Sequence, residues 1–262
     1  VYERLVDEAG DFDGDGLSDV VLVAEDQRYY LLYGQEGLWG GLLDAATLRA
    51  NGERIRQTLF ILPKDSPGRL ILGGGGDVTG DGLDDIVLGA AEEINCGEGC
   101  NRIYDHPVFY LILGQQGGFP AEADVEALIV SGKAARLLPP TAWTRWLAGT
   151  VCVEFLRDMN GDAYGELGVA GPNAEVAGTV SAGGIMVLFG NRSLGGQEIE
   201  LADVGQEVPG FRFTGSERWE SVGQNVQGLG DIDGDGYGDV ALDDSLGQYI
   251  IYGGRSFGGQ YT

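Results

Sequence analysis

The sequence is poor in basic residues, histidine and long hydrophobic runs. It holds 16 Lys and Arg against 41 Asp and Glu, a formal net charge of −25, and it has one histidine. A field of this sign repels phosphate backbones and anionic lipid surfaces, so we expect cations as partners, and not nucleic acids. The longest apolar runs have five or six residues, whereas a membrane-spanning helix needs roughly 20. We therefore expect no membrane insertion.

Catalytic motifs are also lacking. The sequence contains no nucleophile elbow, zincin motif or phosphate-binding loop. His106 has Tyr104, Asp105 and Pro107 as neighbours, which is typical of a loop that leads into a strand, and we expect an incidental or structural role for it. The sequence thus indicates a protein that is not an enzyme. A carboxylate pair for glycoside chemistry stays open, because spacing in sequence cannot place two such groups together.

Glycine, in contrast, is abundant. The chain has 47 glycines among 262 residues but only 8 prolines, and 43% of its residues are hydrophobic. This composition indicates turns within a folded core and not a disordered chain. Only residues 42–50 and 121–128 approach a helical period, so we expect helix to be minor.

The chain is built from four repeats. An acidic segment followed by an apolar strand begins at Asp11, Asp77, Asp158 and Asp231, at intervals of 66, 81 and 73 residues. A second strand, rich in aromatic or β-branched residues and ending in glycine, follows each acidic segment. These second strands are Tyr29–Gly34, Phe109–Gly114, Ile185–Gly190 and Tyr249–Gly253. Each repeat therefore has room for about four short strands.

Two further sets of segments complete the predicted repeats. Apolar stretches that precede each acidic segment read as first strands, at residues 1–6, 69–72, 149–156 and 219–229. Residues 126–130 and 198–202 read as fourth, outer strands. The predicted units are about 1–62, 63–140, 141–215 and 216–262, within one domain.

Repeated four-stranded units that cannot bury their own faces predict an all-β fold, a β-propeller of antiparallel blades. The acidic loop lies between the first and second strand of each blade. Only four units fit, and the fourth lacks an outer strand. A four-bladed ring with one three-stranded blade is favoured over a piece of a longer propeller, because an open array exposes apolar faces and strand edges.

The acidic loops predict calcium sites. Side chains at loop positions 1, 3, 5 and 9 and the carbonyl at position 7 converge oxygen atoms on one point, and glycines at positions 4 and 6 permit the tight turn. Six to eight oxygen ligands suit Ca²⁺. The predicted ligands are Asp11, Asp13, Asp15, Leu17 and Asp19; Asp77, Thr79, Asp81, Leu83 and Asp85; Asp158, Asn160, Asp162, Tyr164 and Glu166; and Asp231, Asp233, Asp235, Tyr237 and Asp239.

Two alternatives compete with this interpretation. An EF-hand loop starts similarly but needs a bidentate Glu at position 12 and flanking helices, whereas position 12 here is Leu22, Leu88, Val169 or Leu242. A single acidic turn is often merely solvated, but four phased copies argue against that reading.

The four copies are unequal. The first and fourth have carboxylates at all four side-chain positions, and we expect them to bind most tightly. Thr79 replaces one carboxylate in the second loop. In the third loop Asn160 removes a charge, Glu166 replaces the last Asp and Ala163 replaces the second glycine. We expect four Ca²⁺ ions, with the third site weakest and with calcium contributing to stability.

The repeats resemble the FG-GAP repeats of the integrin α-subunit β-propeller and its bacterial relatives. The fourth unit is the closest match, with Phe213–Gly223 leading into Gly230–Asp239. The resemblance implies a propeller with structural calcium in its loops, secreted or exposed at the cell surface and used for adhesion or ligand binding. Integrin propellers have seven blades, so the number of units departs from the family pattern.

Together these observations predict a calcium-binding, non-enzymatic scaffold that binds a protein partner through loops, as a monomer or within a larger surface protein. Two alternatives are a lectin-type propeller that binds glycans and a polysaccharide lyase or hydrolase. Trp39, and Trp143 and Trp146 beside Arg145, either cap apolar blade faces or form a sugar- or peptide-stacking surface.

Three cysteines complete the sequence. Cys96 and Cys100 bracket three residues of an acidic loop and could close a small disulfide, which would fit an oxidising compartment. A second pair that would indicate zinc is missing. Cys152, between Val151 and Val153, reads as a small buried hydrophobic residue in a strand.

Overall fold

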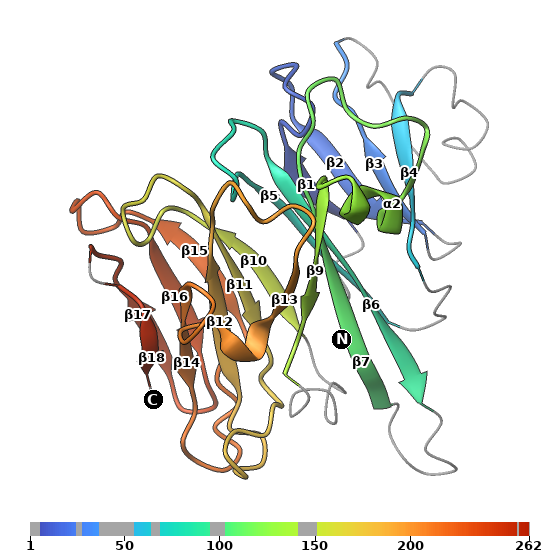
Figure 1. Cartoon of the computed structure of the whole chain (residues 1–262). Coiled ribbons are helices and arrows are strands. Elements are labelled where there is room, and N and C mark those ends of the chain that lie inside the picture. Colours follow the sequence, from blue (N-terminus) through green and yellow to red (C-terminus); the bar gives the residue numbers. More distant parts are fainter. Residues whose placement is uncertain are drawn as a thin grey trace.

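The computed structural model describes residues 6–24, 28–36, 55–63, 69–94, 103–140, 151–255 and 257–261. These residues form strands β1 to β18, the short helix α2 (Val125–Val130) and the 3-10 turn η1 (Leu201–Asp203). The predicted all-β class is confirmed (Figure 1). Among the described residues, no helix has the length and hydrophobicity needed to cross a bilayer.

Four sheets correspond to the four repeats. Each begins with an antiparallel meander in which the acidic segment joins the first strand to the second, as predicted. The first repeat contains β1 (Val6–Gly10), β2 (Asp19–Val23), β3 (Tyr29–Leu32) and β4 (Gln57–Ile61). The second contains β5 (Arg69–Gly76), β6 (Asp85–Ile94), β7 (Ile103–Ile112) and β9 (Ala134–Leu138).

The third repeat follows the same order, and the fourth stops after three strands. The third contains β10 (Cys152–Leu156), β11 (Glu166–Ala170), β12 (Gly184–Phe189) and β14 (Gly210–Thr214). The fourth contains β15 (Val226–Gly230), β16 (Asp239–Asp243) and β17 (Gln248–Ile251). Within the described part of the chain, β17 is the outermost strand of this last sheet.

The outer strands differ from the prediction. Residues 126–130 lie in α2, because Asp124 caps the helix by accepting the Ala127 N–H at 2.9 Å and Val125 and Leu128 are buried on one face. The fourth strands of the second and third repeats are instead β9 and β14. The predicted helical window 121–128 is therefore confirmed in part.

Each complete sheet also receives a fifth strand from the next repeat. The strands β8 (Glu122–Asp124), β13 (Glu198–Glu200) and β18 (Gly259–Tyr261) pair in parallel with β4, β9 and β14 respectively. Of the outer strand predicted at residues 198–202, only β13 is a strand, and η1 follows it. β13 belongs to the second sheet and not to the third. This exchange links consecutive sheets through their outer edges.

The hydrophobic core lies between neighbouring sheets. Successive residues of a strand point to opposite faces, and in β6 the side chains of Ile86 and Leu88 join the core shared with the first sheet. Val87, between them, joins the core shared with the third sheet. A third core lies between the third and fourth sheets and includes Val187 and Val240. The near-continuous apolar strands of the sequence are explained by this burial on both faces.

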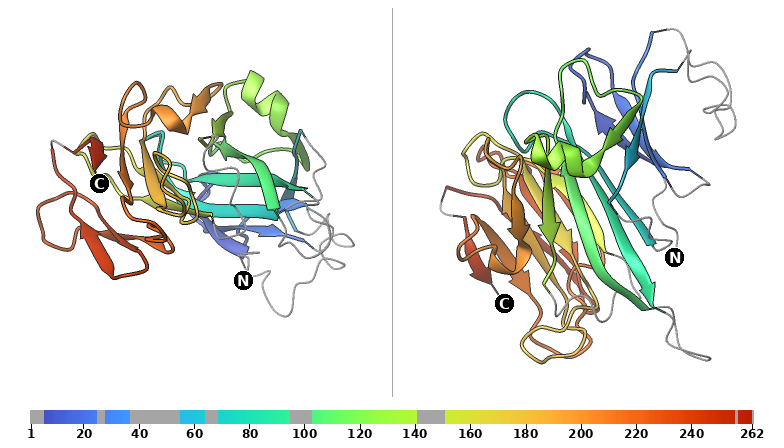
Figure 2. Two further views of the ribbon diagram at one scale, coloured as in Figure 1. Left: turned by 90° about the horizontal axis from the view of Figure 1, so that it is seen from below. Right: turned by 45° about the vertical axis from the view of Figure 1, so that its right-hand side comes forward.

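The sheets follow one another in chain order. The first strands β1, β5, β10 and β15 contact their neighbours in turn, and the first and last sheets lie at opposite ends of the resulting row (Figure 2). The sheets themselves are open. Residues 1–5 of the predicted first strand and the predicted helical window 42–50 lie outside the described residues.

Candidate metal centres

The four acidic turns share one hydrogen-bonded skeleton. We number each turn from its first aspartate, as above. In the first turn, the Asp11 carboxylate accepts the N–H groups of Gly14 at 2.8 Å and Gly16 at 3.0 Å. Asp77, Asp158 and Asp231 make the same pair of bonds to positions 4 and 6 of their own turns. The position 1 carboxylate therefore fixes the turn as well as contributing charge to it.

Positions 4 and 6 require a left-handed backbone. The φ angles at these positions lie between +67° and +94° in all four turns. Glycine adopts this conformation without steric cost, which confirms the reason for its presence there. Position 6 of the third turn is Ala163, with φ of 72°, and its Cβ makes this conformation unfavourable.

In three of the turns the carboxylate at position 9 joins the turn to a glycine just beyond the third strand of its sheet. Asp19 is fully buried and accepts the N–H groups of Phe12 at 3.0 Å and Gly34 at 2.7 Å. Asp85 bonds in the same way to Val78 and Gly114, and Asp239 to Ile232 and Gly253. The glycine that closes the aromatic strand in the sequence is thus the partner of the last carboxylate in the turn.

Burial shifts the acidity of Asp19 and Asp85. Desolvation raises the pKa of Asp19 to about 6 and that of Asp85 to about 8, although the backbone N–H bonds act in the opposite direction. Neighbouring carboxylates of the same turns raise both values further. A positive ion close to either group would favour its charged form.

Glu166 departs from this pattern. Its Oε2 accepts the Met159 N–H at 2.9 Å, but its Oε1 is buried and has no hydrogen-bond partner among the described residues. Burial, followed by repulsion from Asp158 and Asp162, raises the pKa of Glu166 to about 9. A buried carboxylate oxygen without a donor is costly, and a cation is one partner that would satisfy it.

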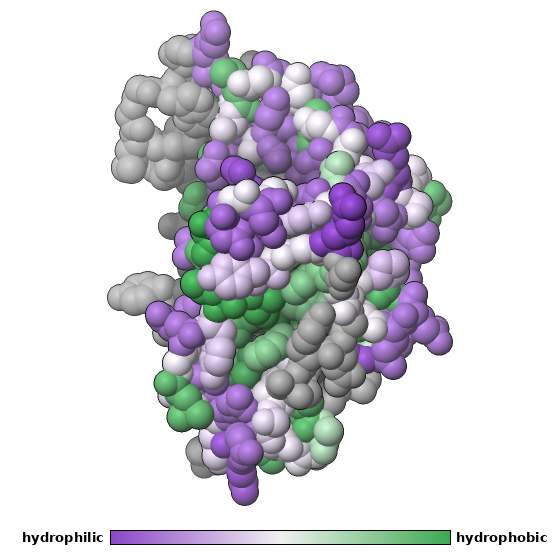
Figure 3. All heavy atoms as spheres, turned by 90° about the vertical axis from the view of Figure 1, so that its left-hand side faces the viewer, coloured by the Kyte–Doolittle hydropathy of each residue, from purple (hydrophilic) through white to green (hydrophobic). Residues whose placement is uncertain are grey.

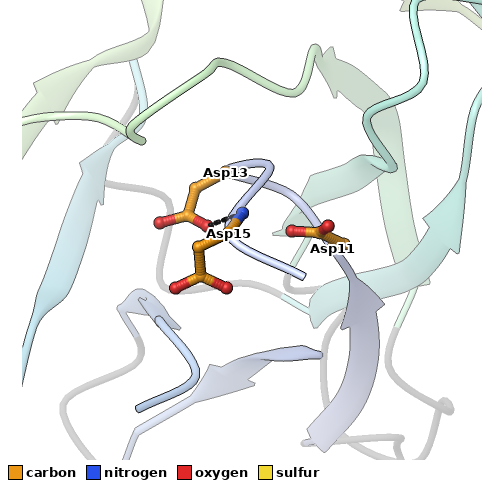
Figure 4. A group of neighbouring side chains, drawn as sticks. All are labelled: Asp11, Asp13 and Asp15. Carbon is orange, nitrogen blue, oxygen red and sulfur yellow. Dashed lines mark hydrogen bonds between the residues drawn. The ribbon is translucent and has the colours of Figure 1, made fainter. Parts of the chain in front are cut away.

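Three turns bring three carboxylates together with one oxygen from each within 4.8 Å of the others. The groups are Asp11, Asp13 and Asp15 in the first turn; Asp158, Asp162 and Glu166 in the third; and Asp231, Asp233 and Asp239 in the fourth. Figure 4 shows the first group around the turn that joins β1 to β2. Asp77, Asp81 and Asp85 of the second turn form no such group.

The remaining predicted ligands have local roles. Thr79 lies with its hydroxyl 3.4 Å from Asp77 Oδ1, and Asn160 donates to the Asp162 carboxylate at 2.9 Å. The N–H groups of the position 7 residues donate to the position 5 carboxylates at 2.9–3.0 Å. These position 7 residues are Leu17, Leu83, Tyr164 and Tyr237, and their partners are Asp15, Asp81, Asp162 and Asp235.

An arginine that the sequence analysis missed pairs with one carboxylate of the first turn. Arg56 forms an ion pair with the fully buried Asp13 and also donates to the Gly117 carbonyl. Its guanidinium lies over the Tyr33 ring, 4.2 Å from the centroid. The only available signal was the rarity of basic residues, since Arg56 lies 43 residues from Asp13 in sequence.

The turns also interlock from one repeat to the next. The N–H groups of Asp84, Gly165 and Gly238, at position 8, donate to the position 1 carbonyl of the preceding turn at 3.2, 2.9 and 2.6 Å. The position 7 side chain covers the position 4 glycine of that turn, so that a Cβ on Gly161 would lie 2.5 Å from the Tyr237 ring. The position 4 glycines are therefore required for this contact as well as for their backbone conformation.

A cavity of about 830 Å³ opens among the second, third and fourth turns. Its lining includes the position 1 residues Asp77, Asp158 and Asp231, together with Arg157 and Tyr237. The position 1 carboxylates of these three turns thus border one common space.

Other candidate residues give less information. Cys96, Cys100, Trp39, Trp143, Arg145 and Trp146 lie outside the described residues. His106 is part of β7 and not of a loop, because the second hairpin extends further than the others. Cys152 is in a strand as predicted, although only partly buried, with its Sγ 3.9 Å from the Val226 carbonyl.

The comparison with known families adds no assignment. No family model matches the chain. The resemblance to FG-GAP repeats therefore stays a prediction that rests on the motifs.

Proposed function

We propose that the chain is a propeller-type domain of the FG-GAP kind whose acidic turns bind Ca²⁺, and that it acts as a non-enzymatic scaffold for a protein partner. The observation that carries the metal proposal is the Glu166 Oε1 atom, buried without a hydrogen-bond partner in the described structure and grouped with Asp158 and Asp162. The four sheets would be consecutive blades of the propeller.

The ligand set fits a hard cation. The three groups supply carboxylate oxygens only, and such oxygens are the ligands that Ca²⁺ takes in flexible numbers. An ion would offset the repulsion among carboxylates that a net charge of −25 intensifies. The second turn lacks a three-carboxylate group, so we expect this turn, and not the third, to bind calcium most weakly.

The interlocking of the turns gives the ions a structural role. Each turn contacts the next through a position 8 N–H group and a position 7 side chain, so an ion that orders one turn also orders its neighbour. The loops on such a rigid frame are then available for partner binding. A secreted or cell-surface location, where calcium is plentiful, accords with this role.

Glu166→Gln tests the metal proposal. With a pKa of about 9, Glu166 is protonated at pH 7 without calcium, so the amide should leave the free energy of unfolding of the chelated protein within about 1 kcal/mol. We expect calorimetric titration with CaCl₂ to show one ion fewer than in the wild type and a smaller calcium-dependent rise in Tm. Glu217→Gln, at an exposed position in the segment that precedes β15, is the control and should bind calcium as the wild type does. Equal calcium binding by the wild type and Glu166→Gln would refute the assignment of this site.

A further inference from the structure

The residue before the fourth strand holds the same place in the first three repeats. Arg56, Lys133 and Pro209 directly precede β4, β9 and β14. The carbonyl group of each accepts the N–H group of the residue before the glycine that closes the third strand, at 3.0, 3.0 and 3.1 Å. The three residues are therefore structurally equivalent, although two are basic and one is proline.

In the first two repeats the basic side chain at this place lies over an aromatic ring. The Arg56 guanidinium pairs with Asp13 of the first turn and lies 4.2 Å from the centroid of the Tyr33 ring. The Lys133 ammonium lies 5.8 Å from the centroid of the Phe119 ring, in the connection from β7 to β9. In both repeats a cation of the chain itself thus fills this place.

The third repeat has a cavity instead. Pro209 carries no charge, and a cavity of about 660 Å³ opens beside it, between the third turn and the connection from β12 to β14. The hydrophobic part of its lining includes the buried residues Leu188, Leu194 and Ile199. No lysine or arginine is among the described residues that line it. A cavity of this size can take in a long side chain.

Carboxylates surround the same cavity. The acidic residues of its lining are Asp162, Glu198, Glu200, Asp203 and Glu207. Glu198 is paired with Arg136 at 2.8 Å, whereas the carboxylates of Glu200, Asp203 and Glu207 have no hydrogen bond or ion pair within the described structure. A basic side chain suits this lining, because its hydrocarbon stem covers apolar surface while its charged end meets the carboxylates.

We propose that this cavity binds a lysine or arginine side chain from an exposed basic segment of the partner protein, in the place that Arg56 and Lys133 fill in the other repeats. The inference rests on the proposed role of the chain as a scaffold, and it adds where and by what chemistry the partner binds. Much of the face drawn in Figure 3 is hydrophilic, and the chain carries a net charge of −25. This charge attracts a basic segment from a distance, and the cavity selects the side chain at contact.

A short basic peptide tests the proposal. A fluorescently labelled Gly-Leu-Lys-Leu-Lys-Leu-Gly peptide is titrated with the full chain, both in EDTA and in millimolar calcium, and binding is followed by anisotropy. We expect saturable binding, and about tenfold weaker binding of the same peptide with glutamine in place of both lysines. In NMR spectra of the chain, the largest amide shifts on binding should lie within residues 191–208.

Two charge-matched variants locate the binding surface. Glu200→Gln combined with Glu207→Gln removes two carboxylates from the cavity and should weaken peptide binding about fivefold. Glu122→Gln combined with Glu217→Gln removes the same charge at exposed positions outside the cavity and should change the affinity less than about twofold. Circular dichroism of both variants confirms that they fold.

Filling the cavity from within gives an independent test. Pro209→Lys places a basic residue where the second repeat has Lys133, and Pro209→Gln makes the same backbone change without the charge. We expect Pro209→Lys to bind the peptide about fivefold more weakly than Pro209→Gln does, because its own ammonium group competes for the carboxylates. Equal affinities of these two variants would contradict the proposal.

Three further results would overturn it. They are no binding of the lysine peptide, equal binding of its glutamine counterpart, and equal weakening by the two double variants. Glu200 and Glu207 belong to none of the three-carboxylate groups of the turns, and the titrations are repeated in EDTA. A failure of calcium binding in a folded chain therefore leaves these results interpretable, so the two proposals are tested separately.

Discussion

The first and third acidic turns differ in what accompanies their buried carboxylates. Both have a position 1 aspartate that accepts the N–H groups of positions 4 and 6. In the first turn Arg56 neutralises the buried Asp13, whereas in the third turn the buried Glu166 keeps an oxygen that no described residue satisfies. The comparison teaches that equal motifs need not depend equally on a metal ion.

Removing the arginine should make the first turn resemble the third. Arg56→Met leaves the Asp13 carboxylate buried and unpaired, and we expect the chelated protein to lose about 2–4 kcal/mol of unfolding free energy. Millimolar calcium should raise the unfolding free energy of Arg56→Met by more than it raises that of the wild type, as measured by urea denaturation with and without EDTA. Arg192→Met, at an exposed position, should change stability by less than about 0.5 kcal/mol. A loss that calcium does not reduce would show that Arg56 and the ion do not share a site.

The free energy of unfolding should depend on pH differently with and without calcium. The folded pKa values of Asp85 and Glu166, about 8 and about 9, lie above their ordinary values of 3.8 and 4.5. At any pH between its ordinary and its folded pKa, each group holds more protons in the folded state than in the unfolded state. The free energy of unfolding therefore falls as the pH rises through that range. We expect the chelated protein to lose several kcal/mol from pH 5 to pH 8, because each of these two groups contributes up to about 1.4 kcal/mol per pH unit.

Calcium should reverse that trend, because it binds the deprotonated carboxylate. The calcium-dependent gain in unfolding free energy is expected to increase from pH 5 to pH 8 in denaturation experiments. A gain that is constant over this range would contradict the role assigned to Glu166.

The interlocking of the turns can be tested with two glycines of the same backbone conformation. Gly161→Ala meets the Tyr237 ring at 2.5 Å, whereas a Cβ on Gly234 meets no atom within 4 Å, and their φ angles are 82° and 81°. We expect losses of about 2 kcal/mol and about 1 kcal/mol respectively in thermal denaturation. Equal losses would mean that the contact between consecutive turns contributes no stability.

The smallest predicted effect is a gain at the third turn. Ala163 has φ of 72° where the other turns have glycine, so Ala163→Gly should stabilise the protein by about 1 kcal/mol. Ala121→Gly, at an exposed position without a positive φ, should be neutral or destabilising. Differential scanning calorimetry distinguishes the two, and a destabilising Ala163→Gly would contradict the argument from backbone strain.

Local features of this fold were predictable because their physical causes are local. The turns at Asp11 and Asp231 and the strands that follow them depend on glycine conformation and on runs of apolar residues, both visible in sequence. The strand predicted at residues 126–130 was wrong because Asp124 caps a helix whose buried residues, Val125 and Leu128, are too few to establish a period. The strand exchange through β13 depends on the pairing of distant edges, which no local pattern specifies.

The candidate site was predictable to the same extent. Carboxylates at positions 1 and 9 could be identified from spacing, but their main partners are backbone N–H groups, and for Asp19 one of these belongs to Gly34, just beyond the end of β3. The pairing of Arg56 with Asp13 spans 43 residues and arises only when β4 is placed beside β3. An ion pair between residues so distant in sequence can be identified only once the fold is known.

Calorimetric titration of the EDTA-treated, dialysed protein with CaCl₂ at pH 7.5 tests the central claim most directly, because it counts ions and measures their affinity together. The account predicts saturable binding of about three ions per chain in the micromolar to millimolar range, one for each three-carboxylate group, accompanied by a rise in Tm of about 5 °C or more. The absence of binding heat at millimolar calcium, with an unchanged Tm, would contradict it.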